Sequence, residues 1–388
     1  MGTLLTESAI GSGRVAVAGA WRSWSSISAI ETAIRASRPA RPMQAVQFTE
    51  HGDRDVIEYG EYPDPEPGRN EALVDVKAGA LNHLDVFTRG GLPGVDLDMP
   101  HVPGSDAAGV VEAVGEDVTR VDPGDRVAVT AGRSCGECEF CRHGEHSLCE
   151  SYHIIGEHVQ GVHSEQAAVP AENLVPVPEG VDWETAAAAP LVFQTAWRML
   201  VTRADLGPGE SILVLGASGG VGHAAVQIAK YIGAEVYATA STDEKLKYAR
   251  ECGADHTVNY EETDFAAAMR EATDGRGVDV VVDYVGPATW EDSIKCLAKG
   301  GRLVTCGATT GPKAETNINR VFWKQVDILG STMASLGEVD DVLSLVWDGT
   351  FEPKIRETLP MSEAARAHEM LEEREGFGKV VVVPDSER

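Results

Sequence analysis

The chain has 388 residues, 43% hydrophobic and 6% aromatic, which is the composition of a folded protein with room for two domains. The sequence contains no run of ~18 consecutive apolar residues, so we expect no membrane span and no membrane partner. Acidic residues number 61 against 33 basic ones, and the net charge of -28 disfavours nucleic acid and anionic lipid as partners.

The acidic excess has two explanations. It is compatible with an ordinary soluble acidic protein, and also with adaptation to high salt, which screens the self-repulsion of such a surface. Arg outnumbers Lys by 23 to 10, which favours the second explanation because Lys exposes a longer apolar stem. We therefore expect a halophilic protein.

The first 42 residues differ from the rest of the chain. They contain five Arg and no Lys, are rich in Ser, Ala and Gly, and lack the continuous apolar segment of a secretory signal. We expect 1–42 to be a disordered leader or a mis-assigned start, with Met43 as the alternative first residue.

From Met43 to about residue 178, short Val- and Ala-rich runs separated by Pro- and Gly-containing turns predict a β-rich region. A helix is predicted over 184–200. Strands and helices then alternate, which predicts a parallel sheet covered on both faces, an α/β fold. Strands are expected at 211–215, 235–238, 256–258, 278–282, 302–306 and 327–329, helices at 220–232, 243–252, 265–272 and 290–297, and near the end helices at 339–347 and 362–372 and a strand at 379–383.

A glycine-rich turn follows the first of these strands. Its sequence, Gly-Ala-Ser-Gly-Gly-Val-Gly, lies between a predicted strand and a predicted helix, the context in which such a turn binds a dinucleotide. Glycines allow the backbone to approach a pyrophosphate, whose charge is met by amides at the helix start. The predicted cofactor-binding residues here are Gly216, Ser218, Gly219, Gly220 and Val221.

The choice of cofactor is made where the second strand ends. An Asp or Glu there would bind the ribose 2′-hydroxyl and select NAD, but the strand ends in Ala-Ser-Thr without a carboxylate. Ser241 can donate to a 2′-phosphate and Lys245 can supply positive charge, although Asp243 and Glu244 lie beside them. We expect NADP(H).

Four cysteines, Cys135, Cys138, Cys141 and Cys149, occur within one polar loop. Their spacing predicts a single tetrahedral zinc ion with four thiolate ligands and no open position, a structural site. An iron–sulfur cluster is the rival, but no second cysteine set follows.

These segments together resemble the zinc-containing alcohol dehydrogenase and quinone oxidoreductase family of medium-chain dehydrogenases/reductases. The resemblance covers 43–388. It implies a GroES-like β-barrel catalytic domain and a Rossmann domain with a doubly wound parallel sheet. The expected segments are the catalytic domain at 43–178 with a zinc lobe at 132–151, the NADP-binding domain at 179–335, and a return to the catalytic domain at 336–388.

The sequence departs from this family where alcohol dehydrogenases hold a catalytic zinc. The matching positions contain Asn82, Ser105 and, less securely, Leu191, which do not replace Cys or His as metal ligands. An improvised site from His83, His101, Asp85, Glu157 and His158 is the alternative.

Residues 80–85 resemble the Asn-x-x-Asp segment of the zinc-free quinone and enoyl reductases. The resemblance implies that Asn82 lies near the nicotinamide and that Asp85 braces the loop, with a capped turn as the plainer explanation. His83, His158 and Tyr152 remain alternatives as proton or hydrogen-bond donors. We predict Asn82, Asp85 and His83 as catalytic residues. Further cofactor contacts are expected from Thr195, Tyr260, Val285, Gly307 and Ser331.

The function we expect is NADPH-dependent reduction of an activated alkene or quinone. The alternatives are a zinc-type alcohol or aldehyde dehydrogenase, acting on a small carbonyl or alcohol, and a non-catalytic NADP-binding redox sensor. We expect a cytoplasmic homodimer or homotetramer.

Overall fold

The structure of the protein is a computed structural model that describes residues 42–374 and 376–387. The leader predicted over 1–42 lies, Pro42 apart, outside the described residues. None of the described helices is long and apolar enough to cross a membrane.

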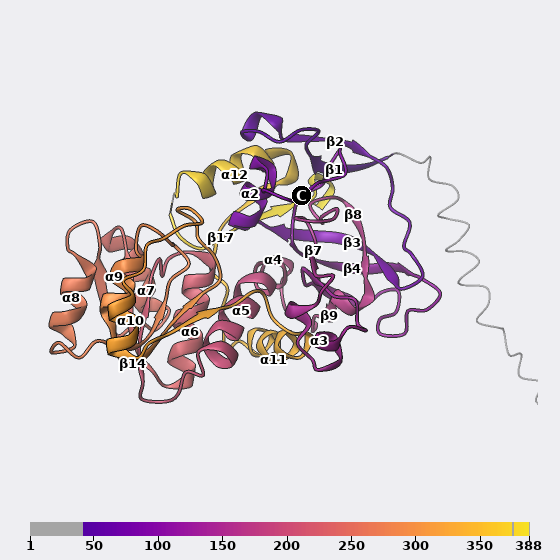
Figure 1. Ribbon diagram of the computed structural model, residues 1–388. Helices are drawn as coiled ribbons and strands as arrows, with labels where there is room; N and C mark the ends of the chain where they lie inside the picture. The colour runs from indigo at the N-terminus through magenta and orange to yellow at the C-terminus, as the bar shows by residue number, and fades with distance from the viewer. Residues whose placement is uncertain (1–41, 375, 388) are drawn as a thin grey trace, which may run out of the picture. The chain divides into compact units, whose positions relative to one another are not determined.

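The predicted α/β arrangement is confirmed by a six-stranded parallel sheet in the second half of the chain. The strand order β12-β11-β10-β13-β14-β15 reverses direction next to β10, as in a dinucleotide-binding fold. The strands are β10 (Ser211–Val214), β11 (Glu235–Ala240), β12 (His256–Asn259), β13 (Val278–Val282), β14 (Leu297–Thr305) and β15 (Asp327–Gly330). Helices pack on this sheet (Figure 1): α6 (Gly220–Ile232), α7 (Asp243–Glu251), α8 (Phe265–Ala272), α9 (Trp290–Cys296) and α10 (Ile318–Lys324).

The first half of the chain and its last residues together form a seven-stranded sheet. Its order is β16-β17-β3-β4-β5-β9, with β8 also paired to β3. Antiparallel pairing of β17 with β3 brings the last strand beside the end of the strand that precedes Asn82. The strands are β3 (Glu71–Ala80), β4 (Asp106–Val114), β5 (Arg126–Val129), β8 (Gln166–Pro170), β9 (Leu174–Pro176), β16 (Ile355–Pro360) and β17 (Lys379–Val383).

Two short antiparallel pairs complete the strands. They are β1 (Met43–Gln47) with β2 (Glu58–Tyr62), and β6 (Gly132–Arg133) with β7 (His153–Ile154). The remaining α-helices are α2 (His83–Gly90), α3 (Glu139–Arg142), α4 (Trp183–Ala188), α5 (Pro190–Trp197), α11 (Leu336–Trp347) and α12 (Ala364–Glu372). Single 3₁₀ turns cover Arg54–Val56, His146–Leu148, Ala171–Asn173, Met361–Glu363 and Asp385–Glu387.

The helix predicted over 184–200 is wrong as a single element. Pro190 starts a new helix because it has no backbone N–H to donate to the preceding turn. The chain therefore forms α4, then α5, and continues as a π-helix over Arg198–Arg203. The described chain also contains α2 and α10, which the sequence did not lead us to expect.

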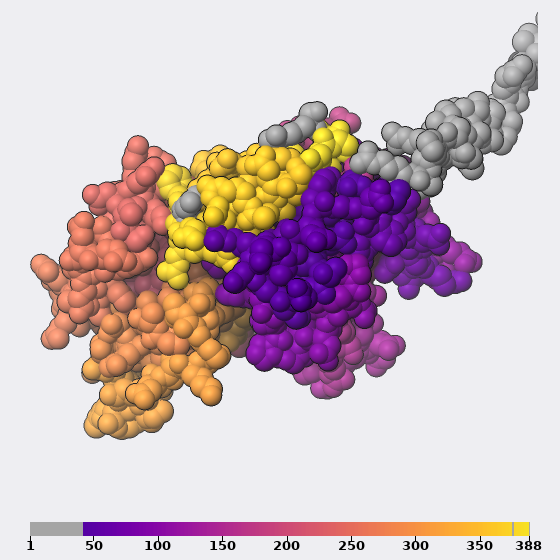
Figure 2. All heavy atoms as spheres, turned by 90° about the horizontal axis from the view of Figure 1, so that it is seen from above, coloured from indigo at the N-terminus to yellow at the C-terminus, as the bar shows by residue number. Residues whose placement is uncertain are grey.

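The C-terminal segment packs against the first part of the described chain. Figure 2 shows the last residues lying against those near the N-terminal end of the described chain. The guanidinium of Arg89, on α2, contacts Glu372 and hydrogen-bonds His368 at 3.3 Å, both on α12. Because Arg89 is buried, these contacts fix α12, and the strand that follows it, against α2.

Candidate active site

The glycine-rich turn links β10 to α6 and has the geometry of a phosphate-binding turn. Gly216 has a φ of +60°, which favours glycine, and its carbonyl accepts hydrogen bonds from the Gly219 amide at 2.9 Å and the Tyr284 hydroxyl at 2.8 Å. A Cβ on Gly222 would lie 2.4 Å from the Gly216 oxygen, so no larger residue fits. The first amides of α6, from Gly220 onward, therefore open onto a backbone surface that an anion can approach. The predicted contacts Ser218, Gly219 and Val221 belong to this same turn.

Basic side chains gather where β11 ends. The Lys245 ammonium donates hydrogen bonds to Ser241 Oγ at 3.4 Å and to the Arg374 carbonyl at 3.0 Å. Burial, followed by the charges of Arg374 and Arg356, lowers the pKa of Lys245. Lys245, Arg374 and Arg356 thus lie within electrostatic reach of one another beside the tip of β11. Tyr260 lies nearby, since its amide donates to the Ala240 carbonyl at the tip of β11.

A cavity of about 690 Å³ opens at the carboxyl ends of β14 and β15. Gly307, Ser331 and Gly286 line this cavity, and Val285 directly precedes Gly286 in the chain. Ser331 Oγ is buried and has no hydrogen-bond partner among the described residues. Ligands of open parallel sheets bind at this edge, so an unsatisfied hydroxyl here suits a polar ligand group.

Thr195 lies on α5. It is buried, and its Oγ1 also has no hydrogen-bond partner within the described chain. The cofactor contacts predicted from the sequence therefore come from separate parts of the sheet's carboxyl edge and from α5. The chemistry of these groups suits a dinucleotide. The backbone amides of the turn and the cations at the tip of β11 can bind phosphate, and the buried hydroxyls of Thr195 and Ser331 are free to hydrogen-bond a ligand.

Asn82, Asp85 and His83 begin α2. The Asn82 amide N–H donates to Asp85 Oδ2 at 2.7 Å, and the Gly104 N–H donates to Asp85 Oδ1 at 3.1 Å. Both oxygens of the buried Asp85 are thus used by backbone, as a bracing role requires; burial nevertheless raises its pKa to about 6. Part of the His83 side chain is exposed to solvent. The protein around the rest of the ring desolvates it, and this effect, followed by the charges of Arg374 and Lys379, lowers the pKa of His83.

A buried lysine that the sequence did not single out lies beside Asn82. The Lys379 ammonium donates to Asn82 Oδ1 at 2.6 Å and to Asp106 Oδ2 at 3.2 Å, while Asn82 Nδ2 donates to the same Asp106 oxygen at 2.9 Å. The side chains of Lys379 and Asp106 are 3% and 0% exposed. We call Lys379, Asn82 and Asp106 the lysine cluster. Since both ends of the Asn82 amide are occupied within it, Asn82 has a fixed orientation.

The other two positions that the family resemblance matches to metal ligands of alcohol dehydrogenases also make internal hydrogen bonds. The Leu191 N–H donates to Asp106 Oδ1 at 2.9 Å, and the buried Ser105 hydroxyl donates to the Ile155 carbonyl at 2.7 Å. Asn82, Ser105 and Leu191 are therefore all committed to internal hydrogen bonds. Burial raises the pKa of Asp106, while the Lys379 ammonium opposes that rise.

The four cysteines come together as predicted from their spacing. Their sulfur atoms all lie within 4.8 Å of one another, with 3.5 Å between those of Cys138 and Cys141 and 4.0 Å between those of Cys135 and Cys141. Tetrahedral Zn–S bonds of about 2.3 Å place sulfurs about 3.8 Å apart. Backbone amides of Cys138 and Ser151 donate to the cluster's sulfurs. These residues can hold a metal ion, and they form the only such group among the described residues.

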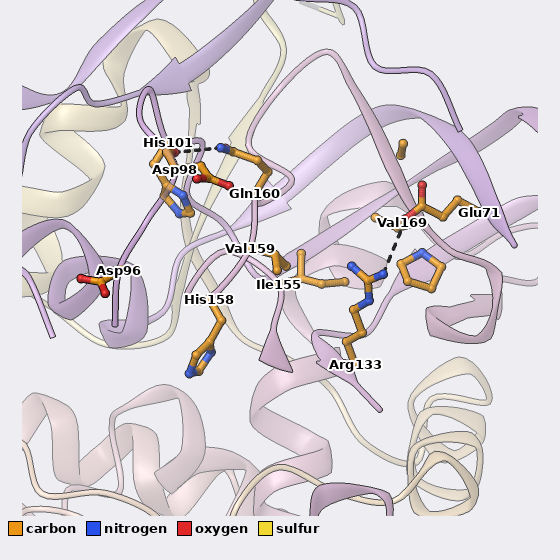
Figure 3. Close-up of a pocket in the computed structure, with 12 residues that line it drawn as sticks. Glu71, Asp96, Asp98, His101, Arg133, Ile155, His158, Val159, Gln160 and Val169 are labelled. Atoms are coloured by element: carbon orange, nitrogen blue, oxygen red, sulfur yellow. Dashed lines mark hydrogen bonds and ion pairs between the residues drawn. The ribbon is translucent and has the colours of Figure 1, made fainter. Parts of the chain in front are cut away.

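The improvised metal site considered from the sequence does not assemble within the described chain, because its five residues do not converge. His158 and His101 instead line a second cavity (Figure 3), whose lining includes no residue of the glycine-rich turn. His158 Nδ1 accepts a hydrogen bond from the Ile154 amide at 3.1 Å, and His101 Nε2 hydrogen-bonds the Gly156 carbonyl at 3.2 Å. Both rings therefore have structural partners.

Two buried polar atoms of the segment 152–157 have no hydrogen-bond partner in the described chain. They are the hydroxyl of Tyr152 and Oε2 of Glu157, both buried. Burial, followed by the charge of Asp85, raises the pKa of Glu157 to about 7. Sequence reasoning considered Tyr152 as a donor, and Glu157 only as a metal ligand.

Sequence reasoning missed Lys379, Arg374 and Arg356 because they come from the last forty residues. Lys379 lies 297 residues from Asn82 along the chain, and only the pairing of β17 with β3 brings them together. The available signal was local: Gly-Lys directly before a Val-rich strand, in a protein with few lysines.

Comparison with known proteins agrees with this geometry. Residues 68–179 match the family described as alcohol dehydrogenase GroES-like domain, and residues 220–348 match zinc-binding dehydrogenase. A quinone oxidoreductase of Pseudomonas aeruginosa is 35% identical, over 87% of this chain and 99% of its own. An acryloyl-coenzyme A reductase of Sulfurisphaera tokodaii is 32% identical, over 84% and 95%.

Solved structures are similar over the same range. One described as an NAD-dependent alcohol dehydrogenase is 45% identical with a TM-score of 0.85, covering 88% of this chain and 99% of its own. A 2-octenoyl-CoA carboxylase reductase in complex with NADP and 2-octenoyl-CoA is 29% identical with a TM-score of 0.83, covering 91% and 90%.

The lysine cluster makes a prediction for stability. Lys379→Met leaves a buried carboxylate without its cation, and we expect a loss of about 3–5 kcal/mol in the free energy of unfolding, measured by urea denaturation at neutral pH. Burial favours the protonated form of Asp106, so the loss should shrink at acidic pH, where that carboxyl is neutral. Adding Asp106→Asn should restore part of it.

Lys354→Met is the matched control, because its ion pair with Glu352 is 37% and 69% exposed and should contribute about 0–1 kcal/mol. Equal effects of the two lysine variants would refute the assignment.

Proposed function

Because the chain belongs to the medium-chain dehydrogenase/reductase superfamily, we propose that it is an NADPH-dependent reductase of activated alkenes or quinones. The protein is an oxidoreductase of this type. Two similar proteins bear names for such reactions, a quinone oxidoreductase and an acryloyl-coenzyme A reductase. A third acts on an enoyl-CoA, with which its structure was solved.

The observation that carries the proposal is the set of side chains, Asn82, Ser105 and Leu191, at the positions matched to the catalytic-zinc ligands of alcohol dehydrogenases. Alcohol oxidation near neutral pH depends on a Lewis acid that lowers the pKa of the alcohol. Here the corresponding side chains are an amide, a hydroxyl and an alkyl group, and Asn82 and Ser105 already use their polar atoms internally. Reduction of an electron-poor alkene or quinone requires only hydrogen-bond donors to its carbonyl oxygen. The residues fit the second reaction.

The cofactor we propose is NADPH, which supplies the hydride when bound. The glycine-rich turn from Gly216 to Gly222 would hold the pyrophosphate. Ser241, Lys245 and Arg374 would bind the 2′-phosphate, because the charges of Lys245 and Arg374 favour a dianion over a hydroxyl and the Ser241 hydroxyl can donate to it. Thr195 and Ser331, whose hydroxyls lack partners, would contact the nicotinamide end.

An alcohol dehydrogenase is the second candidate, since the similar structure at 45% identity is described as an NAD-dependent alcohol dehydrogenase. The same description favours NAD over NADP as the cofactor. The two candidates differ in cofactor and in the number of metal ions, so both can be measured on the purified protein.

The test is a panel of NADPH and NADH with a quinone, a 2-enoyl thioester and an aldehyde, at low and high salt. We expect NADPH consumption with the first or second acceptor. Turnover of the aldehyde or its alcohol alone, together with a second bound zinc, would replace the proposal by alcohol dehydrogenase. Cofactor binding without any turnover would indicate a redox sensor.

Lys245→Ala tests the cofactor choice. Loss of one charge-assisted hydrogen bond is worth about 1.5–3 kcal/mol, so calorimetry should show 2′,5′-ADP binding about 10–100-fold more weakly with 5′-AMP unchanged. Lys247→Ala is the control on the same helix, since Lys247 is 77% exposed and pairs with Glu251. A Lys245 variant that weakens both nucleotides equally would remove Lys245 from the 2′-phosphate site.

We also propose that the four cysteines hold one structural zinc ion. Four thiolates leave no position for substrate. The cluster lies in a lobe tied to the rest of the chain by Glu145, which contacts Arg198, and by His146, whose Nδ1 accepts from the Leu336 amide at 3.3 Å. Bound metal would therefore order a lobe that borders the cavity through Ser147 and Leu148.

Cys141→Ser should lower the zinc content from about one ion per chain to background. Thermal unfolding should shift by about 2–4 °C for each kcal/mol lost. Cys252→Ala, which changes a half-buried thiol outside the cluster, should retain the metal. Full zinc occupancy in the Cys141 variant would contradict the four-thiolate site.

We propose that two copies of the chain pair through β15. This strand is the edge of the six-stranded sheet, and unpaired edges bind other strands unless they are covered. An exposed apolar patch lies beside it, formed by Ile318, Phe322 and Trp323 of α10 and Ile328 of β15. Trp323 is 75% exposed, which is unusual for an isolated subunit.

Trp323→Glu together with Ile328→Asp should convert a particle of at least twice 41.3 kDa into one of 41.3 kDa, measured by light scattering. Charges placed at such an interface are desolvated without partners. Tyr231→Glu, at an exposed aromatic outside the patch, should leave the mass unchanged. A monomeric parent protein would contradict the proposal directly.

The domain boundaries, the cytoplasmic location and the adaptation to high salt remain proposals. Pairing of β17 with β3 supports a return of 336–388 to the catalytic domain. Free thiols arranged as metal ligands suit a reducing compartment. The charge of -28 supports high salt.

A further inference from the structure

The cavity at the carboxyl ends of β14 and β15 differs in charge from the rest of the protein. Acidic residues outnumber basic ones by 61 to 33 in the whole chain, yet the lining of this cavity includes two arginines, Arg198 and Arg203, and no acidic residue. The lining of the second cavity includes three carboxylates, Glu71, Asp96 and Asp98, against one arginine (Figure 3). The first cavity is therefore the one of the two that favours an anion.

The two arginines of this cavity differ in whether their charge is compensated. Arg198 is buried and pairs with both Glu145 and Glu338, the second at 2.6 Å, so its charge is neutralised within the protein. Arg203 is exposed, and its Nε donates to the Gly330 carbonyl at 2.7 Å. No carboxylate pairs with Arg203 in the described part of the chain. Arg203 thus adds an uncompensated positive charge to the wall of the cavity.

The contact with Gly330 determines which nitrogens of Arg203 a ligand can use. Since Nε is engaged, the two terminal nitrogens, Nη1 and Nη2, remain available. Together they present a fork of N–H groups that matches the two oxygens of a carboxylate. The Nε hydrogen bond also anchors the planar guanidinium, so less side-chain freedom is lost when an anion binds.

The position of Arg203 relates it to the proposed cofactor site. Its acceptor, Gly330, directly precedes Ser331, whose N–H donates to the Thr305 carbonyl at 2.9 Å and so fixes the chain after β15 against the end of β14. Ser331 lines the same cavity as Arg203, and its buried Oγ has no partner within the described chain. Arg203 therefore lies at the end of the cavity where the nicotinamide is proposed to bind.

The rest of the lining offers a ligand mainly apolar contacts. Leu148, Pro287 and Trp290 belong to it. Two of its hydroxyls are engaged within the protein, because Thr305 Oγ1 donates to a backbone carbonyl at 2.9 Å and Thr316 Oγ1 accepts from the Trp290 indole at 2.9 Å. Apolar walls with few polar groups bind a ligand by its apolar body and orient it by its polar group. A ligand with an apolar body and one anionic group suits this cavity.

We propose that Arg203 binds a carboxylate on the alkene acceptor, so that the preferred substrates are unsaturated acids with an apolar body. The inference rests on the proposed function and narrows its acceptors to those that carry a negative charge. A phosphate of a CoA thioester is the other source of an anion. That phosphate is separated from the double bond by the whole pantetheine arm, whereas Gly330 holds Arg203 beside Ser331. The carboxylate is therefore the anion that fits this position.

The pairing also has a consequence for the reduction. The alkene takes the hydride on the carbon β to the carboxylate and a proton from water on the α-carbon, while the cofactor is oxidised. The negative charge of a free carboxylate opposes the arrival of hydride. A guanidinium paired with that carboxylate offsets this charge.

The test compares the binding of trans-cinnamate with that of its methyl ester, which has the same apolar body and no charge. Titrations followed by saturation-transfer NMR, on the protein with its oxidised cofactor bound, require no turnover. A charge-assisted pair at an exposed arginine corresponds to about tenfold in affinity, so the acid should bind about 10-fold more tightly than the ester. Arg203→Ala should bring this ratio to about 1, and Arg203→Lys should keep part of it.

Arg270→Ala is the matched control, because Arg270 is an exposed arginine of α8 that does not line the cavity. It should keep the ratio of the parent protein. Arg203→Ala should have the parent's mass in light scattering. A changed mass would assign Arg203 to a contact between chains and overturn the carboxylate site.

The outcomes separate the two proposals. Equal binding of acid and ester by the parent, or a preference for the acid that survives in Arg203→Ala, would overturn the carboxylate site. A loss confined to cinnamoyl-CoA, and absent for cinnamoyl-pantetheine without its phosphates, would overturn it in favour of the phosphates of CoA. A parent that binds cinnamate through Arg203 but reduces no alkene or quinone would overturn the proposed function alone.

Discussion

The hydrogen-bonded contact of Lys379 with Asn82 and Asp106 is the constraint on which the site depends. A buried ammonium is tolerated only when acceptors surround it. Here the acceptors are Asn82, which follows β3, and Asp106, which begins β4, and β17 brings Lys379 to them by pairing with β3. The contact therefore fixes three segments at once. It also fixes the Asn82 side chain, since an amide whose oxygen and nitrogen are both committed cannot turn.

This arrangement changes the role expected of Asn82. Sequence resemblance places Asn82 among the catalytic residues, but its side-chain oxygen and nitrogen are hydrogen-bonded to Lys379 and Asp106 within the protein. Buried polar atoms of Tyr152, Glu157, Thr195 and Ser331 are among those that have no hydrogen-bond partner in the described chain. In a native protein such buried atoms need an explanation, and a bound cofactor and substrate supply one. Asn82 and Asp85 then hold the start of α2, which is the bracing role.

The proposed cofactor-binding region is likewise assembled from distant parts of the chain. The glycine-rich turn and the tip of β11 belong to one sheet, whereas Arg374 and Arg356 arrive with the C-terminal segment. In a protein with a net charge of -28, a local group of three cations stands out electrostatically. Long-range repulsion of an anionic cofactor by the surface is thus countered at short range, where screening is weakest.

Local patterns in the sequence determined much of this protein. The strand–glycine-turn–helix unit at 211–232 and the alternation of strands and helices specify the parallel sheet, because glycine conformation and apolar periodicity act over a few residues. The spacing of the four cysteines predicted their convergence for the same reason. Pro190 is also a local signal, because a residue without a backbone N–H starts α5 where the sequence pattern predicts one continuous helix. What only the tertiary structure decided is the chemistry at the start of α2. Whether a carboxyl keeps its proton depends on the donors around it, and those of Asp106 come from residues 24, 85 and 273 positions away along the chain. Periodicity does not encode such contacts, since burial and hydrogen bonding are properties of the packed chain.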